Sequence, residues 1–361
     1  MISNLIFLLK RVLFIQFCFY LFSCGNVMPL TGGEKDIKPP KLIITNPENL
    51  TKNFLNDKII FLFDENISAK NLGNNIFSSP AIPDLKHKIK GNQLELSFDN
   101  NKLKELTYLI QLNQTIKDIN EGNILNKLEY VFSTKDIIDT LSFSGFAVDA
   151  YLDIPMEDIW ILLYENNIND SAIFKQQPNF VCKTDSLGFF NFKHLDNLEY
   201  KAFAISGLDF KFNNNDKIGF KQSATLEKSL DSIIYLFDPY FSHDSITNLF
   251  LESERKNSDT ILEKTGKLIL NLNKSQDIII QLSQDNQPKF IGLYNQSECL
   301  ISDLKVGEYE MRVFLDSNKN GYWDTGSLLN QVQAEKSILY NKKISIRENW
   351  DLELNWIIYE L

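Results

Sequence analysis

Short apolar runs separated by turn residues recur along most of the chain from Lys41 onward. In residues 41–135 these runs are rich in Ile, Leu, Phe, Tyr and Thr. β-Branched and aromatic enrichment at this length is typical of strands rather than helices. The turn sequences between the runs, such as Asn-Pro and Glu-Gly-Asn, predict a small β-sandwich. The predicted strands are 42–44, 58–64, 93–98, 107–112 and 130–134.

The same pattern returns twice, so the predicted fold class is all-β with tandem β-sandwich domains. Residues 136–245 predict a second sandwich, in which a turn at residues 185–188 leads into an aromatic strand. Residues 246–265 mix apolar spacing with many charges and predict a linker with a short helix. Residues 266–361 predict a third sandwich. The predicted strands are 141–148, 159–164, 189–192, 198–204 and 233–237, then 268–272, 277–282, 290–294, 309–315, 343–346 and 352–358.

One pair of segments suggests that the third sandwich is a divergent repeat of the second. The sequence YKAFAISG from Tyr200 aligns with YEMRVFLD from Tyr309. Each is a strand that Tyr opens and a turn closes seven residues later. Internal similarity of this kind is the sequence signature of a repeated unit.

The first 23 residues have the profile of an export signal. Lys10 and Arg11 precede an apolar run at residues 12–22, and no acidic residue is present. The run ends in LFSCG, which resembles the bacterial lipobox, so Cys24 is the predicted acylated first residue of the mature chain. Its acyl chains would hold the protein in a membrane leaflet without a transmembrane span. The alternative is an uncleaved anchor helix, which Lys10 and Arg11 disfavour because a span needs about 20 apolar residues.

Residues 24–40 predict a flexible tether between this lipid anchor and the first sandwich. They contain Gly32-Gly33 and Pro39-Pro40, and no apolar period runs through them. Residues 25–30 are neutral, and the first acidic residues are Glu34 and Asp36. The mature chain after residue 23 has a net charge of −12, which predicts a body that stands off the membrane surface.

Length and charge exclude several classes of function. The chain has 361 residues, of which 43% are apolar and 23% charged, enough for two or three domains with cores of their own. Its net charge is −10, and removal of residues 1–23 leaves 35 basic and 47 acidic residues, or −12. Because no segment concentrates basic residues, nucleic acid is not expected as a partner.

Cysteine and histidine are sparse, and their spacing matches no zinc site. Without the signal and Cys24, two cysteines remain in an oxidising compartment, where they would form a disulfide or stay as buried thiols. Their separation places them in different predicted sandwiches, which makes the thiol alternative at least as strong. The residues are His87, His194, His243, Cys18, Cys24, Cys182 and Cys299.

Several motifs follow one another in residues 24–135: TGG at 31–33, PP at 39–40, NP at 46–47, IFLFDE at 60–65, SP at 79–80, DINEGN at 118–123 and VFST at 131–134. With these motifs the segment resembles the N-terminal bacterial Ig-like domain of outer-membrane lipoproteins from Bacteroidota. The resemblance continues more loosely to the C-terminus, where members of that family carry prealbumin-like or carboxypeptidase-regulatory-like sandwiches. It implies an Ig-like domain followed by two such sandwiches, a lipid anchor in the outer membrane and no assigned catalytic residues.

The sharpest local signal is the segment DSNKNGYWD at residues 316–324. Side-chain oxygens stand at positions one, three, five and nine, Gly321 stands at six, and a backbone carbonyl is available at seven, as in a calcium loop. Ser327 replaces the bidentate Glu of position twelve, so only a weak, structural Ca²⁺ site of about 10⁻⁴ to 10⁻³ M is expected. The alternative is a turn in which Asn and Asp cap their own backbone. The predicted ligands are Asp316, Asn318, Asn320, Tyr322 through its carbonyl, and Asp324.

The aligned segment of the second sandwich lacks this ligand set. Gly207 stands in place of Asp316, and Lys211 stands in place of Asn320. The turn can therefore exist without a metal. A metal at residues 316–324 would brace the loop rather than catalyse a reaction.

Two carboxylate pairs are weaker candidates. Asp64 and Glu65 end a strand, and Asp118 and Glu121 lie in a turn, so all four are expected to be solvated. A glycosidase would need two carboxylates facing each other across a cleft, which the sequence does not indicate.

The histidines and tryptophans give no evidence of a catalytic site either. His87 and His194 lack a neighbouring carboxylate or nucleophile and are expected to be exposed. Trp323, Trp350 and Trp356 are close in sequence and, if exposed, would stack on sugar rings or anchor a partner. Alternation with Leu354 and Ile358 predicts core packing for Trp356.

Three functions remain open from the sequence. The leading one is a non-enzymatic outer-membrane lipoprotein that acts as a scaffold or accessory subunit of a complex with other envelope proteins. The second is a surface module that binds a glycan or a peptide, for which a row of exposed aromatics on one sheet face would be the mark. The third, an enzyme, needs a polar constellation that the sequence does not show. The neutral residues after Cys24 favour the periplasmic face of the outer membrane, because surface-exported lipoproteins of that phylum carry acidic residues there.

Overall fold

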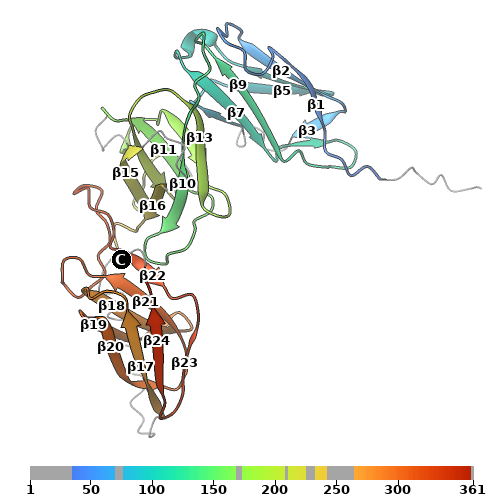
Figure 1. Cartoon of the computed structure of the whole chain (residues 1–361). Coiled ribbons are helices and arrows are strands. Elements are labelled where there is room, and N and C mark those ends of the chain that lie inside the picture. Colours follow the sequence, from blue (N-terminus) through green and yellow to red (C-terminus); the bar gives the residue numbers. More distant parts are fainter. Residues whose placement is uncertain are drawn as a thin grey trace, which may run out of the picture.

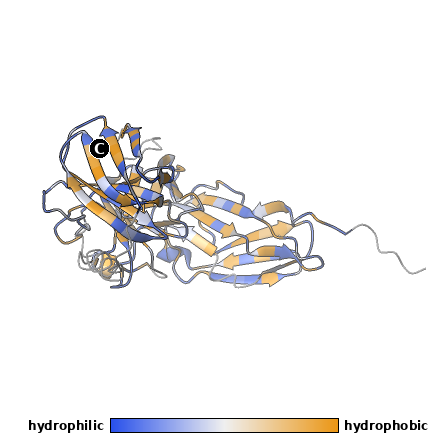
Figure 2. Ribbon diagram, turned by 90° about the horizontal axis from the view of Figure 1, so that it is seen from below, coloured by the Kyte–Doolittle hydropathy of each residue, from blue (hydrophilic) through white to orange (hydrophobic). Residues whose placement is uncertain are grey.

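The computed structural model describes residues 35–69, 76–167, 173–207, 210–224, 232–241 and 264–358. In this part of the chain the regular structure is β-strand apart from the 3₁₀ helix η1 (Asn100–Lys102) and 3₁₀ residues at 173–174, which confirms the all-β, tandem-sandwich fold class. The strands form three successive groups (Figure 1), and hydrophobic and hydrophilic residues alternate along many of them (Figure 2). The predicted signal at residues 1–23, Cys24, and all but the last two residues of the predicted linker lie outside the described residues.

The first sandwich packs a sheet of order β1-β2-β6-β5 against a sheet of order β4-β7-β9, with β3 and β8 paired beside them. Its core is aromatic, because strands such as β2 alternate buried and more exposed positions. The Phe132 ring lies 4.2 Å from Phe54 and 5.1 Å from Tyr108, centroid to centroid. The strands are β1 (Leu42–Asn46), β2 (Lys58–Phe63), β3 (Ile67–Ala69), β4 (Ile76–Ser79), β5 (Lys86–Lys90), β6 (Gln93–Ser97), β7 (Thr107–Asn113), β8 (Ile116–Asp118) and β9 (Lys127–Ser133).

The second sandwich packs a three-stranded sheet, β13-β10-β16, against a four-stranded sheet, β12-β11-β14-β15. β10 pairs antiparallel with β13 and parallel with β16. Apolar residues such as Phe143, Leu163 and Phe190 fill the space between the sheets. The strands are β10 (Leu141–Asp149), β11 (Trp160–Glu165), β12 (Phe180–Lys183), β13 (Phe189–Leu195), β14 (Tyr200–Ile205), β15 (Ile218–Ala224) and β16 (Ser232–Leu236).

The third sandwich repeats this strand order, with sheets β20-β17-β24 and β19-β18-β21-β22. β17 pairs antiparallel with β20 and parallel with β24, as β10 does with β13 and β16. The short β23 also pairs with β21. The strands are β17 (Thr265–Leu272), β18 (Ile278–Gln284), β19 (Gln287–Tyr294), β20 (Glu298–Lys305), β21 (Gly307–Leu315), β22 (Ser337–Leu339), β23 (Ile344–Ile346) and β24 (Asp351–Trp356).

The two aligned tyrosines occupy matching places in the two sandwiches. Tyr200 and Tyr309 are both buried, and each hydroxyl donates to an oxygen of the residue four positions earlier, Asp196 in one case and Lys305 in the other. The repeat that one aligned strand suggested therefore extends to the topology of the whole sandwich.

Replacement of Phe132 by Ala should weaken the first sandwich strongly. The side chain is fully buried among other rings, and removal of such a group leaves a cavity that costs about 3–5 kcal/mol. Calorimetry should show a large fall in the melting temperature of one transition. Leu55→Ala is the control, because Leu55 is 79% exposed in the same sandwich. Equal effects of both changes would contradict the aromatic core.

Candidate functional site

The loop between β21 and β22 is held by Asp316, a buried carboxylate at its start. One oxygen of Asp316 accepts the backbone N–H of Asn320 at 3.0 Å, and the other accepts that of Gly321 at 2.9 Å. Gly321 has a φ of +82°, a conformation that side chains with a Cβ rarely adopt. The sequence therefore specifies a tight turn directly after the strand.

The other predicted ligand side chains gather at the same turn. The amide groups of Asn318 and Asn320 donate to Oδ2 of Asp324 at 2.5 and 2.7 Å. Oδ1 of Asn320 accepts the backbone N–H of Tyr322 at 2.8 Å, and the Tyr322 side chain is exposed. The structure thus brings together the four predicted ligand side chains, those of Asp316, Asn318, Asn320 and Asp324. Each of them already makes hydrogen bonds to other groups of the same turn.

Glu335 completes the loop, although sequence reasoning missed it. Its carboxylate accepts the backbone N–H of Ser317 at 2.7 Å and of Asp324 at 3.1 Å, tying the two sides of the loop together. Burial raises the pKa of Glu335, and the nearby charges of Asp324 and Asp316 add to this rise. No local spacing signals Glu335, because the chain returns to the turn eleven residues after Asp324.

The loop has few charged ligands for a cation. Among the residues that the structure describes, no three His, Cys, Asp or Glu side chains are placed to hold a metal ion together. The Lys319 ammonium pairs with Asp277 at 2.9 Å at the edge of the turn. A weak Ca²⁺ site and a self-capped turn both remain compatible with this geometry.

Two expectations about other polar residues were wrong. Asp118 is buried rather than solvated, because its carboxylate accepts the backbone N–H groups of Glu121, Gly122 and Asn123. His194 is half-buried, and its Nδ1 lies 2.9 Å from the carbonyl oxygen of Asp139.

The same loop carries Trp323 into the second sandwich. The indole is 4% exposed, packs edge-on against Tyr151 at 5.1 Å and Phe241 at 5.2 Å, and donates its N–H to the carbonyl of Glu335 at 2.8 Å. Trp323 is therefore buried and does not meet the condition of exposure under which it would stack on a sugar ring. The sequence indicated Trp323 as a candidate. It did not predict its partners Tyr151 and Phe241, because they lie in another sandwich, far from Trp323 in the chain.

Hydrogen bonds and close packing extend this joint on both sides of Trp323. The Thr325 hydroxyl donates to the carbonyl of Asp238 at 2.6 Å, and the Gln333 amide donates to that of Phe220 at 2.9 Å. A Cβ added to Gly326 would lie only 2.4 Å from the ring of Phe237. The backbone at Gly326 thus lies so close to the Phe237 ring that only glycine fits at this position.

Arg312 of β21 anchors the joint from the third sandwich. Its Nη1 donates to the carbonyl of Tyr151 at 2.6 Å and to the Ser337 hydroxyl at 2.9 Å, and its guanidinium lies 5.6 Å from the centre of the Tyr151 ring. Burial lowers the pKa of Arg312. Ile279 and Phe314 join Trp160 and other residues of the second sandwich in one apolar cluster. The two sandwiches therefore share a continuous core.

The remaining tryptophans and cysteines have simpler surroundings. Trp350 is 60% exposed, whereas Trp356 is half-buried against the third core and lies 5.1 Å from the Tyr340 ring. Cys182 and Cys299 are free thiols in different sandwiches, so the structure contains the thiol alternative and not the disulfide. Burial raises the pKa of both, that of Cys299 to about 11.

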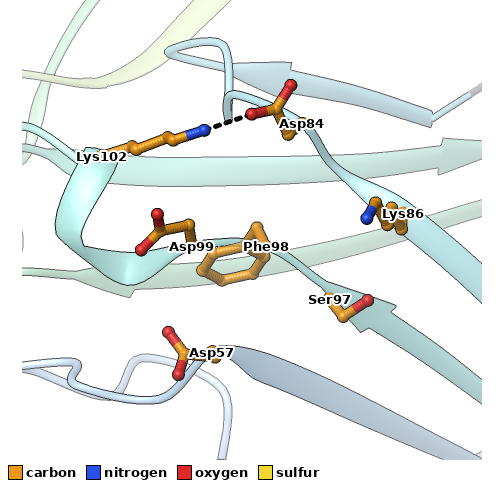
Figure 3. Close-up of a pocket in the computed structure, with 7 residues that line it drawn as sticks. All are labelled: Asp57, Asp84, Lys86, Ser97, Phe98, Asp99 and Lys102. Atoms are coloured by element: carbon orange, nitrogen blue, oxygen red, sulfur yellow. Dashed lines mark hydrogen bonds and ion pairs between the residues drawn. The ribbon is translucent and has the colours of Figure 1, made fainter.

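A hollow of about 470 Å³ at one end of the first sandwich offers little free chemistry (Figure 3). Lys102 pairs with Asp84 at 2.5 Å across it. Asp57 and Asp99 accept the backbone N–H groups of Asn100 and Asn101. The charged groups therefore serve the local turn and are not aimed at a common point.

Comparisons with known proteins identify the first sandwich. A family model described as a bacterial Ig-like domain matches residues 36–134. No curated protein matches the chain. The Bacillus anthracis TIE protein is similar at 12% identity and a TM-score of 0.18, over 91% of this chain and 58% of its own. A streptococcal ancillary pilin is similar at 11% identity and a TM-score of 0.17, over 75% of this chain and 80% of its own.

The chain therefore contains a bacterial Ig-like domain, followed by two sandwiches of one topology. It spans less than two thirds of the length of the TIE protein. In the described ranges, no helix has the length and apolar character that a membrane crossing requires.

Removal of the Trp323 side chain should loosen the joint between the second and third sandwiches. Trp323→Ala deletes a buried indole, at a cost of about 3–5 kcal/mol. Calorimetry should show a lower melting temperature and a separation of transitions that coincide in the wild type. Trp350→Ala, which removes an exposed indole in the same sandwich, should leave the profile unchanged. A similar profile for both variants would contradict the role of Trp323.

Proposed function

We propose that this protein is a non-enzymatic, lipid-anchored scaffold or accessory subunit of a protein complex in the bacterial envelope. The observation that carries the proposal is the shared core between the second and third sandwiches, centred on Trp323. A chain built this way holds distant surfaces in a fixed relation, which a scaffold requires and a freely jointed string of domains does not provide.

The joint between the Ig-like domain and the second sandwich supports the same proposal. Asp139 pairs with Lys135 at 2.6 Å and accepts the Thr107 hydroxyl at 2.8 Å, which pins the connecting segment. Phe77 packs edge-on against Trp160 at 5.2 Å. Both connections along the chain are therefore made of specific contacts.

The membrane anchor in this proposal rests on the sequence around Cys24. Residues 35–40 are the described part of the tether: residues 35–39 are exposed and Pro40 is buried. Asp64 accepts the backbone N–H of Lys41 where the first sandwich begins. Acyl chains on Cys24 would place the Ig-like domain nearest the outer membrane, with the periplasmic face favoured. The acidic body would keep the sandwiches away from an anionic surface.

Replacement of Cys24 tests the anchor. Cys24→Ala removes the only thiol that a lipobox would acylate, so the protein should move from the membrane fraction to the soluble fraction. Cys18→Ala is the matched control, because Cys18 lies inside the apolar run of the signal. Unchanged membrane attachment of Cys24→Ala would refute the lipid anchor.

Cross-linking in intact cells tests the scaffold. The tagged protein, purified from outer membranes in gentle detergent, should bring other envelope proteins with it in fixed stoichiometry. Trp323→Ala should lose some of these partners while Trp350→Ala keeps them. Recovery of the protein alone would count against a scaffold.

We further propose that the Asp316–Asp324 turn binds Ca²⁺ weakly and thereby braces the Trp323 joint. The turn and the indole belong to one loop, so a cation that replaced the hydrogen bonds now accepted by Asp316 and Asp324 would hold the two in place together. The role of the ion would be structural.

Calcium should then stabilise the wild type. At about 10 mM Ca²⁺, a site of about 10⁻³ M adds about 1.4 kcal/mol. This is worth roughly 2–4 °C in melting temperature for a chain of this size. Asp324→Asn should abolish the rise, and Asp303→Asn, an exposed change on β20, should not. No rise in the wild type would leave the loop as a self-capped turn.

A further inference from the structure

A groove of about 520 Å³ lies between the Ig-like domain and the second sandwich. One wall is the face of sheet β4-β7-β9, where Phe77, Gln111 and Glu129 form a row across three paired strands. The opposite wall comes from β11, β12 and β13 and includes Lys183 and Asn191. Both domains therefore contribute to the groove, a common arrangement for ligand sites.

The second sandwich is open on the side that faces this groove. Among the described strands, β12 pairs with β11 alone and β13 with β10 alone, so each is the edge of a different sheet. No described strand closes the space between these edges. Polar side chains of both edges are thus presented to the groove rather than buried in a core.

The charges that line the groove are balanced and held in place. Burial alone would raise the pKa of Glu129, but hydrogen bonds from Lys127, Lys193 and Gln111 outweigh it and lower the pKa to about 2. Its carboxylate lies 2.8 Å from Lys127 and 3.1 Å from Lys193. Lys183 pairs with Asp158 at 2.9 Å. The wall offers both donors and acceptors, and a charged ligand would have to compete with these pairs.

Two amide side chains in the groove are available to a ligand. Gln114 and Asn191 line it from opposite domains, and neither side chain makes a hydrogen bond to another described residue. An amide offers a donor and an acceptor side by side, which suits neighbouring hydroxyl groups.

The aromatic residues do not form an open apolar pocket. Trp160 is 8% exposed, with the Lys183 ammonium 5.4 Å from its ring centre and Phe77 and Phe210 packed edge-on against it. A protein or peptide ligand would need a pocket for an apolar anchor. The groove instead favours a ligand bound through hydroxyl groups.

From these features we propose that the groove between the Ig-like domain and the second sandwich binds a neutral oligosaccharide. Of the two ligand classes that the sequence left open, glycan and peptide, the free amides and the paired charges favour the glycan, although the described lining holds no exposed row of aromatics of the kind that the sequence set as the mark of such a module. Its volume fits a segment of about three sugar units, within the range of ordinary ligand sites. Hydroxyl groups would bond the free amides of Gln114 and Asn191 and the paired charges of Glu129 and its lysines. The proposal does not depend on the scaffold, because the observation that carries the scaffold is the Trp323 joint between the second and third sandwiches.

Calorimetric titration of the purified chain tests this site. The probes are maltopentaose, cellopentaose, xylopentaose, mannopentaose and N-acetylchitopentaose, each against the wild type. At least one should bind, and Gln114→Ala with Asn191→Ala should weaken that binding about tenfold or more, since each lost hydrogen bond is worth about 1 kcal/mol. The matched control is Gln287→Ala with Asn330→Ala, two exposed amides of the third sandwich, which should bind as the wild type does.

A second variant tests whether loss of binding reflects the groove itself rather than misfolding of the chain. Asn191→Trp places a large ring in the groove and should abolish binding while the melting profile stays that of the wild type. Failure of all five probes to bind would overturn the proposal. So would binding that the groove variants leave unchanged, or groove-dependent capture of an extended peptide, Ac-TVTVTV-NH₂, in place of the sugars.

Discussion

Burial of the Trp323 indole between Tyr151 and Phe241 is the contact on which the arrangement of the second and third sandwiches depends. The indole sits on a loop, and a loop alone would not hold so large a group in place. Asp316 holds the start of that loop by accepting the backbone N–H of Gly321, and Glu335 links its two sides by accepting that of Asp324. Arg312 of the third sandwich donates a hydrogen bond to the carbonyl of Tyr151. Each of these polar groups is paired within the joint, as burial demands. The arrowheads of β10 and β17 point toward the junction from opposite sides (Figure 1).

The second and third sandwiches share one topology but differ in the loop that follows the matching strands β14 and β21. In the second sandwich the loop after β14 is short, and Asp216 closes it by accepting the N–H of Asn213 at 2.8 Å. In the third sandwich the loop after β21 runs from 316 to 336 and crosses to its neighbour. Loops tolerate such insertions better than strands do, because they lie outside the shared core. Trp323 is the eighth residue of this loop, and its ring centre lies 5.1 Å from that of Tyr151.

Every central strand of the described sheets was predictable from the sequence, whereas about half of the edge strands, such as β5, β12 and β20, were missed. Runs such as those of β2, β11 and β18 are apolar because both neighbours and a core surround them. β5, with the sequence KHKIK, and β20 are edges that carry charges against unwanted pairing, so they lack a strand signature. The turn at Asp316 was found because its ligands are consecutive. Glu335, the partners of Trp323 and the groove between domains were missed, because they depend on residues far apart in the chain.

The most direct test of the shared core is the distance between the second and third sandwiches in solution. Spin labels at Asn197→Cys and Ser302→Cys, two exposed positions, would report it by double electron–electron resonance in a chain whose native cysteines are replaced. We predict one narrow distance distribution that broadens when Trp323→Ala is added. A broad distribution in the parent chain, unchanged by Trp323→Ala, would contradict a fixed joint.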